Sequence, residues 1–258
     1  MNIKHLPDER FGPVGARLYG KLGDAGLWPF HDELATWIAD HLARTAGEPP
    51  GRARPALDLL DLGSGTGALV ARVAAKNPAL TILGLDASPH MAAVAHRHLR
   101  RGRRPGNAGM DGPHGGASFP PADSQPILGI GDGEALPLRD ACVRLAVSTL
   151  SFHHWEEPQA SLVELYRVLV PGGALWILEP DPDFTLLAVR AGLRRWLSIL
   201  PPVWLLRRAF RDHGFAAAEY ESLVAPLVAR TPFLSIRSVR PFLWLRWMTL
   251  RREPDHGT

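Results

Sequence analysis

The chain has 258 residues with a net charge of +3, and 46% of the residues are hydrophobic. This length and composition are typical of one large globular domain. Cys142 is the only cysteine, which excludes an intrachain disulfide and a cysteine-based zinc site, and the sequence predicts no other metal site. Since the polar first ten residues are unlike a secretory signal, we expect a cytoplasmic protein.

Residues 1–50 are predicted to form an N-terminal helical arm or cap, and residues 51–258 to form the main domain. Glycines and prolines interrupt residues 1–30. From His31 to Ala43 the apolar residues recur at helical spacing, so we expect a helix there.

The rest of the chain is organised around a glycine-rich stretch. The apolar run Leu57–Leu62 ends in Gly63, Gly65 and Gly67, and a helical pattern follows from Ala68 to Lys76. This order predicts a strand, a tight turn and a helix. Glycine permits positive φ and lets a ligand approach the backbone, and the N–H groups at the start of the helix are then free to bind it.

A second apolar run, Leu80–Leu85, ends in Asp86. An acid at the tip of the second strand of a βαβ unit is placed to bind the hydroxyls of a ribose. The sequence therefore predicts a cofactor that contains a nucleoside. The next helix is expected to begin at Pro89 with Ser88 as its cap and to end near Arg100.

Strands and helices continue to alternate after an irregular segment. Residues 101–125 are rich in glycine and proline and are predicted to be a flexible insertion. The further elements are predicted as strands over Pro126–Gly131 and Val143–Leu150, a helix over Gln159–Leu169, and a strand over Ala174–Leu178 that follows the turn Pro171–Gly173. Such alternation indicates a parallel sheet covered by helices on both faces, with ligands at the carboxyl ends of its strands.

The last third of the chain is predicted less regularly. Helices are expected over Phe184–Leu200 and Trp204–His213, and strands over Phe215–Leu223 and Thr231–Val239. The pattern of Phe242–Leu250 assigns no element. Twelve arginines lie between Arg190 and Arg252 among several tryptophans, which fits a nucleic acid, an anionic membrane surface, a lipophilic substrate or simply solvated helix faces.

Five motifs in order resemble the class I S-adenosylmethionine-dependent methyltransferases, in particular the small-molecule subgroup that includes the ubiquinone and menaquinone methyltransferases. The motifs are Asp61-x-Gly63-x-Gly65-x-Gly67, Asp86, Gly131–Pro137, Ser151-Phe152-His153-His154-Trp155 and Arg167-Val168-Leu169-x-Pro171-Gly172-Gly173. The resemblance covers about residues 55–180. The fold class predicted with it is α/β, with a Rossmann-like, doubly wound, seven-stranded sheet that is mostly parallel and has a final antiparallel strand.

The resemblance implies a role for individual residues around S-adenosylmethionine. Asp61 would bind the methionine amino group above the turn of Gly63, Gly65 and Gly67, and Asp86 would bind the ribose hydroxyls. The remaining implied contacts are Ala87 and Met91 beside the adenine, Asp132 at its exocyclic amine, Gly133 and Glu134 along its ring, and the carbonyls of Leu150 and Ser151 near the methyl donor. Tyr19, or else Phe11, would cover the cofactor.

A dinucleotide enzyme is the main alternative, because Gly63-x-Gly65-x-x-Ala68 also satisfies the dinucleotide fingerprint. Asp61 counts against this NAD(P)-dependent oxidoreductase, since a carboxylate beside the turn repels an anionic pyrophosphate. It would instead accept a hydrogen bond from an ammonium group. A simpler role for Asp61, as a cap of the turn itself, and a non-catalytic protein with this fold are further alternatives.

Methyl transfer requires alignment of an acceptor and, where the acceptor carries a proton, a base. His153 and His154 are the predicted catalytic residues, although a structural hydrogen bond is the alternative for at least one of them. Because adjacent residues of an extended chain point to opposite sides, only one is expected to face the site. Glu179, Asp181 and Asp183 are further candidates, with helix capping as the favoured role of Asp183.

The acceptor is predicted to be a small, lipophilic molecule. Residues 184–208 are apolar and rich in arginine and tryptophan, and they follow the fifth strand, where this fold commonly builds a lid. A peripheral membrane contact is a second use of the same segment. Nucleic acid is not an expected partner, because Ser151–Trp155 differs from the motif of nucleic-acid methyltransferases at this place. The oligomeric state is left open.

Overall fold

The computed structural model describes residues 30–45, 55–101, 126–183, 211, 213–234, 236–239 and 245–254. Most of the predicted arm, the insertion after Arg101 and the predicted lid over residues 184–208 lie outside these residues. The helix predicted from His31 to Ala43 is present and extends over residues 30–44. No helix in the described part of the chain is both long and apolar enough to cross a bilayer.

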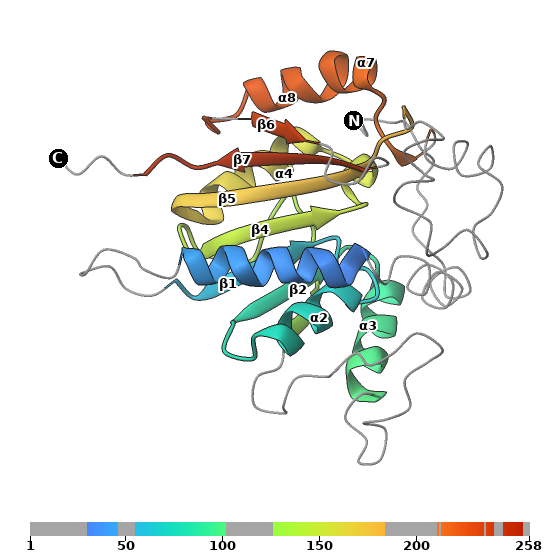
Figure 1. Ribbon diagram of the computed structural model, residues 1–258, viewed down its shortest axis with the longest axis vertical. Helices are drawn as coiled ribbons and strands as arrows, with labels where there is room; N and C mark the ends of the chain where they lie inside the picture. Colours follow the sequence, from blue (N-terminus) through green and yellow to red (C-terminus); the bar gives the residue numbers. More distant parts are fainter. Residues whose placement is uncertain are drawn as a thin grey trace.

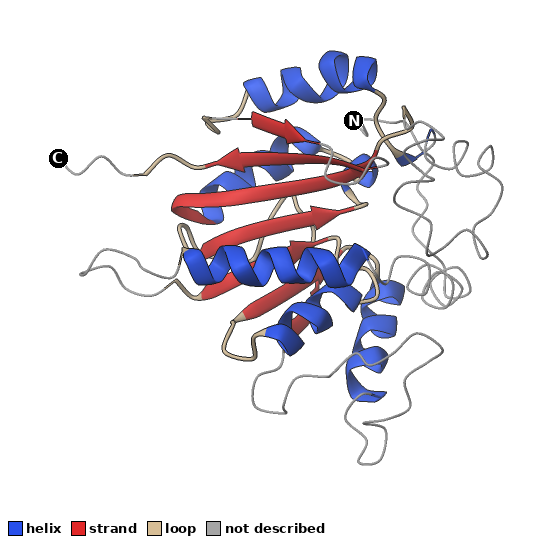
Figure 2. Cartoon of the chain, in the orientation of Figure 1, coloured by secondary structure: helices blue, strands red, loops and turns tan. Residues whose placement is uncertain are grey.

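The strands of the described residues form one twisted sheet in the order β3-β2-β1-β4-β5-β7-β6 (Figures 1 and 2). The strands are β1 (Leu57–Leu62), β2 (Ile82–Asp86), β3 (Ile127–Ile130), β4 (Val143–Thr149), β5 (Leu169–Pro180), β6 (Ile236–Val239) and β7 (Leu245–Arg251). The first five pair in parallel, and β7 pairs antiparallel with both β5 and β6. The predicted α/β, Rossmann-like sheet, mostly parallel with antiparallel pairing at one edge, is confirmed.

The strand order reverses direction between β1 and β4. From β1 the chain proceeds through β2 to β3 on one side, and it then returns to place β4 and β5 on the other side. The loops that follow β1 and β4 therefore separate at the carboxyl edge of the sheet and leave room for a ligand.

Helices cover both faces of the sheet (Figure 1). The helix over residues 30–44 and α2 (Ala68–Lys76) pack on one face, and α4 (Pro158–Val168) and the helical residues 217–229 pack on the other. Buried side chains of the first layer include Phe30, Leu34, Ile38, Leu42, Leu69, Val70 and Val73, and those of the second include Leu162, Leu165, Tyr220, Val224 and Val228. Two apolar layers around a sheet buried on both sides are the core expected of this fold class.

The helices that follow the glycine-rich turn and Asp86 agree with the sequence prediction. Helix α2 has the predicted bounds, and α3 (Pro89–Arg101) begins at the predicted proline. The backbone N–H of Met91 donates to Oγ of Ser88 at 3.3 Å, so Ser88 caps α3 as expected.

The strand predicted over Phe215–Leu223 is wrong, because this segment is helical. It forms α7 (Ala217–Glu219), the wider turn η3 (Tyr220–Val224) and α8 (Ala225–Ala229). Tyr220, Val224 and Val228 are buried at intervals of four residues, which is the spacing of a helix face. Carboxylates satisfy the first N–H groups, since Glu219 accepts from Ala216 at 2.9 Å and Asp183 from Ala217 at 2.7 Å.

Two further elements differ from the sequence prediction in extent. Strand β5 includes the predicted turn Pro171–Gly173, and its pairing with β4 shifts register between Val143 and Leu145. Gly172 has φ 83° there. Residues 242–250, which had no assignment, contain most of β7, and β6 is the only strand among the described residues of the predicted strand Thr231–Val239.

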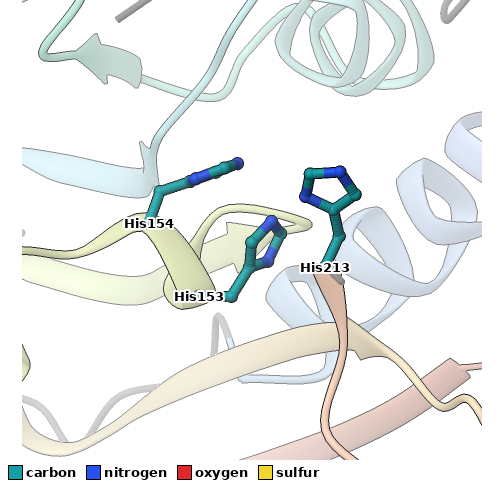
Figure 3. Close-up of side chains that lie close together, drawn as sticks. All are labelled: His153, His154 and His213. Atoms are coloured by element: carbon teal, nitrogen blue, oxygen red, sulfur yellow. The ribbon is translucent and has the colours of Figure 1, made fainter. Parts of the chain in front are cut away.

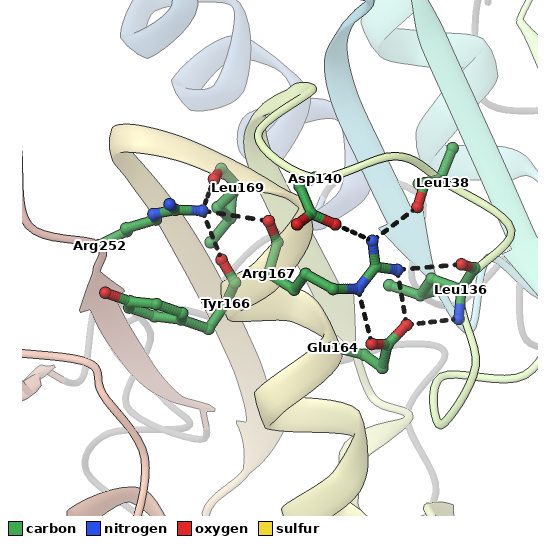
Figure 4. Close-up of polar contacts among 8 residues, drawn as sticks. All are labelled: Leu136, Leu138, Asp140, Glu164, Tyr166, Arg167, Leu169 and Arg252. Atoms are coloured by element: carbon green, nitrogen blue, oxygen red, sulfur yellow. Dashed lines mark hydrogen bonds and ion pairs between the residues drawn. The ribbon is translucent and has the colours of Figure 1, made fainter.

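An arginine on α4 ties the loop after β3 to this helix (Figure 4). Arg167 forms two hydrogen bonds with Glu164, at 2.7 and 2.8 Å, and one with Asp140 at 2.6 Å. It also donates to the carbonyls of Leu136 and Leu138. This paired geometry lowers the pKa of Glu164, chiefly through its hydrogen bonds to Arg167.

Arg252 binds backbone carbonyls at the C-terminal end of the same helix (Figure 4). Its Nη1 donates to the carbonyls of Tyr166, Arg167 and Leu169 at 3.1, 3.1 and 2.6 Å. These carbonyls belong to the last turn of α4, where a cation is favoured by the helix dipole. The end of β7 is thereby attached to the junction of α4 and β5.

A buried ion pair joins the inner strands to the N-terminal helix. Arg144 on β4 contacts Asp58 on β1 at 2.7 Å and donates to the carbonyl of Leu42 at 2.8 Å. Asp58 is 0% exposed and also accepts from the N–H of Thr81 at 2.9 Å. The pair therefore connects four segments that are distant in the sequence.

We expect Asp58→Ala to lower the free energy of unfolding by about 3–5 kcal/mol, because it leaves the Arg144 charge buried without its partner. Urea denaturation of the full chain measures this change. Asp140→Ala is the matched control, since it removes another arginine partner whose side chain is 77% exposed. Its expected cost is at most about 1 kcal/mol, and equal losses in the two variants would contradict the prediction.

Candidate functional site

A pocket opens at the carboxyl edge of the sheet, where the loops after β1 and β4 separate. It encloses about 370 Å³ with the adjoining open solvent included. This edge of the sheet is the expected place for a ligand site. The lining residues are His31, Asp61, Gly63, Ser64, Gly65, Thr66, Ala68, Leu69, Thr149 and Leu150.

The predicted glycine turn forms one wall of the pocket. Gly63, Gly65 and Gly67 have φ values of 78°, 55° and 72°, which side chains rarely adopt. A Cβ on Gly63 would lie 1.9 Å from Oγ of Ser151, whereas a Cβ on Gly65 would meet no atom within 4 Å. Gly65 thus leaves open space above the turn. Gly67 does not line the pocket but is the N-cap of α2.

Asp61 is the most unusual residue of the pocket. Its carboxylate is 2% exposed, and no hydrogen-bond partner within the described residues reaches Oδ1. Burial, and secondarily the charge of Asp86, raises its pKa to about 7. A buried acceptor without a donor is costly, so Oδ1 of Asp61 fits a ligand that carries a hydrogen-bond donor. A capping role for Asp61 within the turn would have supplied that donor.

Asp86 lies at the end of β2 and holds the turn in place. Its Oδ2 accepts from the N–H of Gly65 at 2.8 Å, and its Oδ1 accepts from the N–H of Ser88 at 2.8 Å. Burial raises the pKa of Asp86. Each carboxylate oxygen can accept a further bond, so hydroxyl groups of a ligand remain acceptable partners. Ala87 follows as an exposed residue, and Met91 is buried one turn into α3.

The predicted adenine-binding turn lies after β3 and contacts α4. Oδ1 of Asp132 accepts from the N–H of Glu134 at 3.2 Å, and Oε1 of Glu134 accepts from the N–H of Glu157 at 2.9 Å. A Cβ on Gly133 would lie 2.9 Å from Oγ of Ser161, so this glycine permits the close approach of α4. None of the three lines the pocket described above.

The loop after β4 brings Leu150 and Ser151 to the glycine turn. Leu150 lines the pocket with φ 54°, and its N–H donates to the carbonyl of Leu178 at 2.8 Å. Ser151 contacts Gly63, as described above. Both predicted residues therefore lie beside the first glycine of the turn. Tyr19 and Phe11 lie outside the described residues.

A buried glutamate organises this loop from the end of β5. Glu179 is 0% exposed, and its Oε1 accepts from the N–H groups of Ser151 and Phe152 at 3.0 and 2.7 Å. Its Oε2 lies 2.5 Å from Nδ1 of His153, which is also buried. A carboxylate that accepts three such bonds holds both the backbone and the imidazole in one arrangement.

His153 and His154 lie on the same side, contrary to the expectation for an extended chain. They belong to the 3₁₀ turn η2 (Phe152–His154), and their ring centroids are 4.0 Å apart. Burial, followed by the neighbouring His153 and His213, lowers the pKa of His154 to about 3. His154 is therefore neutral at physiological pH and is a weak base.

The other two predicted acids have structural partners. Asp181 is buried and pairs with Arg246 on β7 at 3.1 Å. Asp183 accepts a hydrogen bond from the N–H of Ala217, so it caps a helix, which was the favoured prediction for this residue. The capped helix is α7, which the sequence did not predict. Neither residue lines the pocket.

Sequence reasoning missed His31 and Thr149 in the pocket. His31 begins the N-terminal helix, and its Nδ1 is buried with no hydrogen-bond partner among the described residues, as is Oγ1 of Thr149. Burial lowers the pKa of His31 to about 3, so the ring is neutral. Neither residue belongs to a sequence motif. Only the folded structure, which brings both to the carboxyl edge of the sheet, identifies them as pocket residues.

Comparison with known proteins agrees with this geometry. Residues 60–177 match a family model described as a methyltransferase domain. The malonyl-[acyl-carrier protein] O-methyltransferase of Methylococcus capsulatus is 35% identical over 51% of this chain and 38% of its own length. The demethylmenaquinone methyltransferase of Thermus thermophilus is 31% identical over 48% of this chain and 47% of its own length. The chain thus spans less than half the length of each of these relatives.

A solved structure extends the likeness of the fold to nearly the whole chain. It is a putative S-adenosylmethionine-dependent methyltransferase from Methanococcus maripaludis, with a TM-score of 0.66, 20% identity and 98% coverage of both chains. The matched family model begins in β1 and ends in β5, so it includes the glycine turn, Asp61, Asp86 and the loop of His153. Residues 60–177 therefore resemble a methyltransferase domain, and the fold is similar to that of the Methanococcus protein.

Proposed function

We propose that this protein transfers a methyl group from S-adenosylmethionine to a small acceptor molecule. The observation that carries the proposal is Asp61, a buried carboxylate in the wall of the pocket with one oxygen that no described residue pairs. The ammonium group of a methionine moiety would supply the missing hydrogen bond and would balance the negative charge.

Asp61 and Asp86 together disfavour a dinucleotide as the ligand of this pocket. Asp61 and Asp86 are close enough for the charge of Asp86 to raise the pKa of Asp61. Two carboxylates beside the glycine turn repel a pyrophosphate, whereas a cationic sulfonium with an ammonium group is attracted. An NAD(P)-dependent oxidoreductase therefore fits this pocket less well than a methyltransferase does.

The remaining cofactor contacts are proposed from the family resemblance. Asp86 binds the ribose hydroxyls, Leu150 and Ser151 offer carbonyls, and the turn of Gly63 and Gly65 allows close approach. Ala87, Met91, Asp132, Gly133 and Glu134 are proposed around the adenine, Gly67 supports the turn, and Tyr19 is proposed as a cover.

S-adenosylmethionine, when bound, supplies a methyl group that its sulfonium already activates. The protein's own task is then to align the acceptor, exclude water and, where the acceptor carries a proton, accept it. Of the two predicted bases, His153 is favoured, because the Glu179 carboxylate stabilises the charged imidazole and holds its orientation. The low pKa of His154 makes it the weaker base.

We propose a lipophilic acceptor, without assigning the atom that is methylated. Two observations support this class: the apolar, arginine- and tryptophan-rich sequence of residues 184–208, and the name of the Thermus relative, which specifies a quinone acceptor. A peripheral membrane contact would bring such an acceptor to the protein. No observation favours a nucleic-acid partner.

Calorimetric titration of the full chain tests the choice of cofactor. We expect S-adenosylmethionine and S-adenosylhomocysteine to bind with one site each, and NAD to give no binding heat. Asp86→Asn should weaken binding by about tenfold or more, because it removes a charged acceptor for the ribose. Binding of NAD alone would contradict the proposal.

The pH dependence of cofactor binding tests Asp61. With a pKa of about 7, Asp61 is mainly protonated at pH 6, and it must ionise to pair with an ammonium group. Binding then releases a proton, so affinity for S-adenosylhomocysteine should rise about fivefold from pH 6 to pH 7. In Asp61→Asn the affinity should be weaker and should not show this rise, and an equal rise in both proteins would contradict the assignment.

The same pKa predicts the stability of the ligand-free protein. Because folding raises the pKa of Asp61 above its ordinary value of 3.8, its protonated form is favoured in the folded state. The contribution to stability is therefore complete below pH 4 and is lost as the pH rises to about 7. Asp61→Asn should flatten this part of the stability curve in urea denaturation at successive pH values.

The acceptor class is tested with S-adenosylmethionine carrying a radiolabelled methyl group. Cell extract separated into lipid and aqueous fractions supplies the acceptors, and we expect labelled product from the lipid fraction. Labelling only of polar, water-soluble molecules would reject a lipophilic acceptor. Cofactor binding with no labelled product from any fraction would favour the non-catalytic alternative.

A further inference from the structure

Three histidines converge beside the cofactor pocket (Figure 3). Each of His153, His154 and His213 offers a ring nitrogen, and these nitrogens all lie within 4.8 Å of one another. The ring centroid of His213 is 5.3 Å from that of His153 and 5.8 Å from that of His154. In Figure 3 the three rings point toward a common space.

Two separate parts of the chain supply these rings. His153 and His154 follow β4 on the turn η2, and His213 precedes α7. In a 3₁₀ turn consecutive side chains lie about 120° apart rather than on opposite faces as in a strand, and the ring centroids of His153 and His154 are 4.0 Å apart. Two residues after His213 in the chain, the ring centroid of Phe215 lies 5.9 Å from that of Phe152. That aromatic contact between buried residues keeps the two segments together.

Glu179 prepares one of the rings as a ligand. A carboxylate can only accept, so the 2.5 Å contact places the proton of His153 on Nδ1. In the neutral ring the lone pair is then on Nε2. Histidine ligands of metal ions usually have such a carboxylate partner, which fixes both the tautomer and the orientation of the ring.

We propose that His153, His154 and His213 bind one zinc ion, with Glu179 as the positioning residue of His153. Three imidazoles suit zinc and related first-row metals, whereas magnesium and calcium require oxygen ligands. Zn–N bonds of 2.0–2.1 Å place tetrahedral ligands about 3.3 Å apart, so the nitrogens close by about 1.5 Å at most. His153 is buried, whereas His154 and His213 are half-buried.

The set of ligands indicates an open coordination position. Structural zinc sites usually have four protein ligands, whereas sites with three leave one position for water or another molecule. The site adjoins the pocket, because His153 is two residues from Ser151, which contacts Gly63. If the proposed function holds, on which this last step rests, the open position selects acceptors that carry an oxygen, nitrogen or sulfur ligand.

Zinc titration of the full, tag-free chain, freed of metal with a chelator, tests the site. We expect one equivalent of Zn²⁺ to bind by calorimetry, and Tm to rise by about 5–10 °C at a zinc concentration of 100 times Kd. Co²⁺ in its place should give the visible absorption bands of a tetrahedral site. Neither measurement requires S-adenosylmethionine, so a failure here is distinct from a failure of the proposed methyl transfer.

Variants locate the bound ion. His213→Ala and His154→Ala should each weaken zinc binding by at least tenfold, and Glu179→Gln should weaken it by about 10–100-fold because it removes the charge behind His153. His96→Ala, on the exposed face of α3, is the matched control and should bind zinc as the unchanged protein does. Both half-buried positions tolerate alanine without loss of the core, and circular dichroism checks their folding.

The outcomes decide the proposal in both directions. Loss of stoichiometric binding in the cluster variants, with binding kept in His96→Ala, supports the site. Absence of stoichiometric zinc binding to the unchanged protein, or equal affinities for His213→Ala and His96→Ala, overturns it.

Discussion

The arrangement of the site depends on the buried carboxylate of Glu179. It accepts from two consecutive backbone N–H groups and from the ring of His153, and it thereby fixes the loop that follows β4. This loop carries Leu150 to the pocket and Ser151 to Gly63. A charge buried at the carboxyl end of β5 is tolerable only because every one of these donors is in place.

Asp61 presents the opposite case within the same sheet. Both acids lie near the ends of inner strands and are almost completely buried, but an oxygen of Asp61 has no partner among the described residues. The protein satisfies the carboxylate that builds the loop and leaves unsatisfied the one that faces the pocket. On the proposed function, this difference separates a structural acid from a binding acid, and sequence position alone does not reveal it. The family resemblance and the electrostatics of the pocket then agree on a cationic cofactor.

The imidazole cluster shows how the same loop serves a second purpose. The hydrogen bond that orders His153 also leaves its other nitrogen available, and the 3₁₀ turn brings His154 to the same side. His213 completes the group from a segment about 60 residues later in the chain. With zinc bound, Nε2 of His153 is a metal ligand and is not available as a base. The proposed zinc site and the proposed general base are therefore alternative roles of His153.

The local sequence determined the central βαβ unit, because the glycines, Asp86 and the cap Ser88 act on neighbours within a few residues. The alternation of strands and helices likewise predicted the α/β class and the parallel inner strands, whereas the resemblance of the five motifs implied the cofactor. Predictions from local sequence patterns were wrong where contacts between distant parts of the chain determine the secondary structure. The segment after Phe215 is helical because Asp183 and Glu219 satisfy its first N–H groups and a buried face covers the sheet. The unpaired oxygen of Asp61, the role of Glu179 and the meeting of His213 with His153 arise only from tertiary structure, since burial and hydrogen bonding depend on partners far apart in the chain.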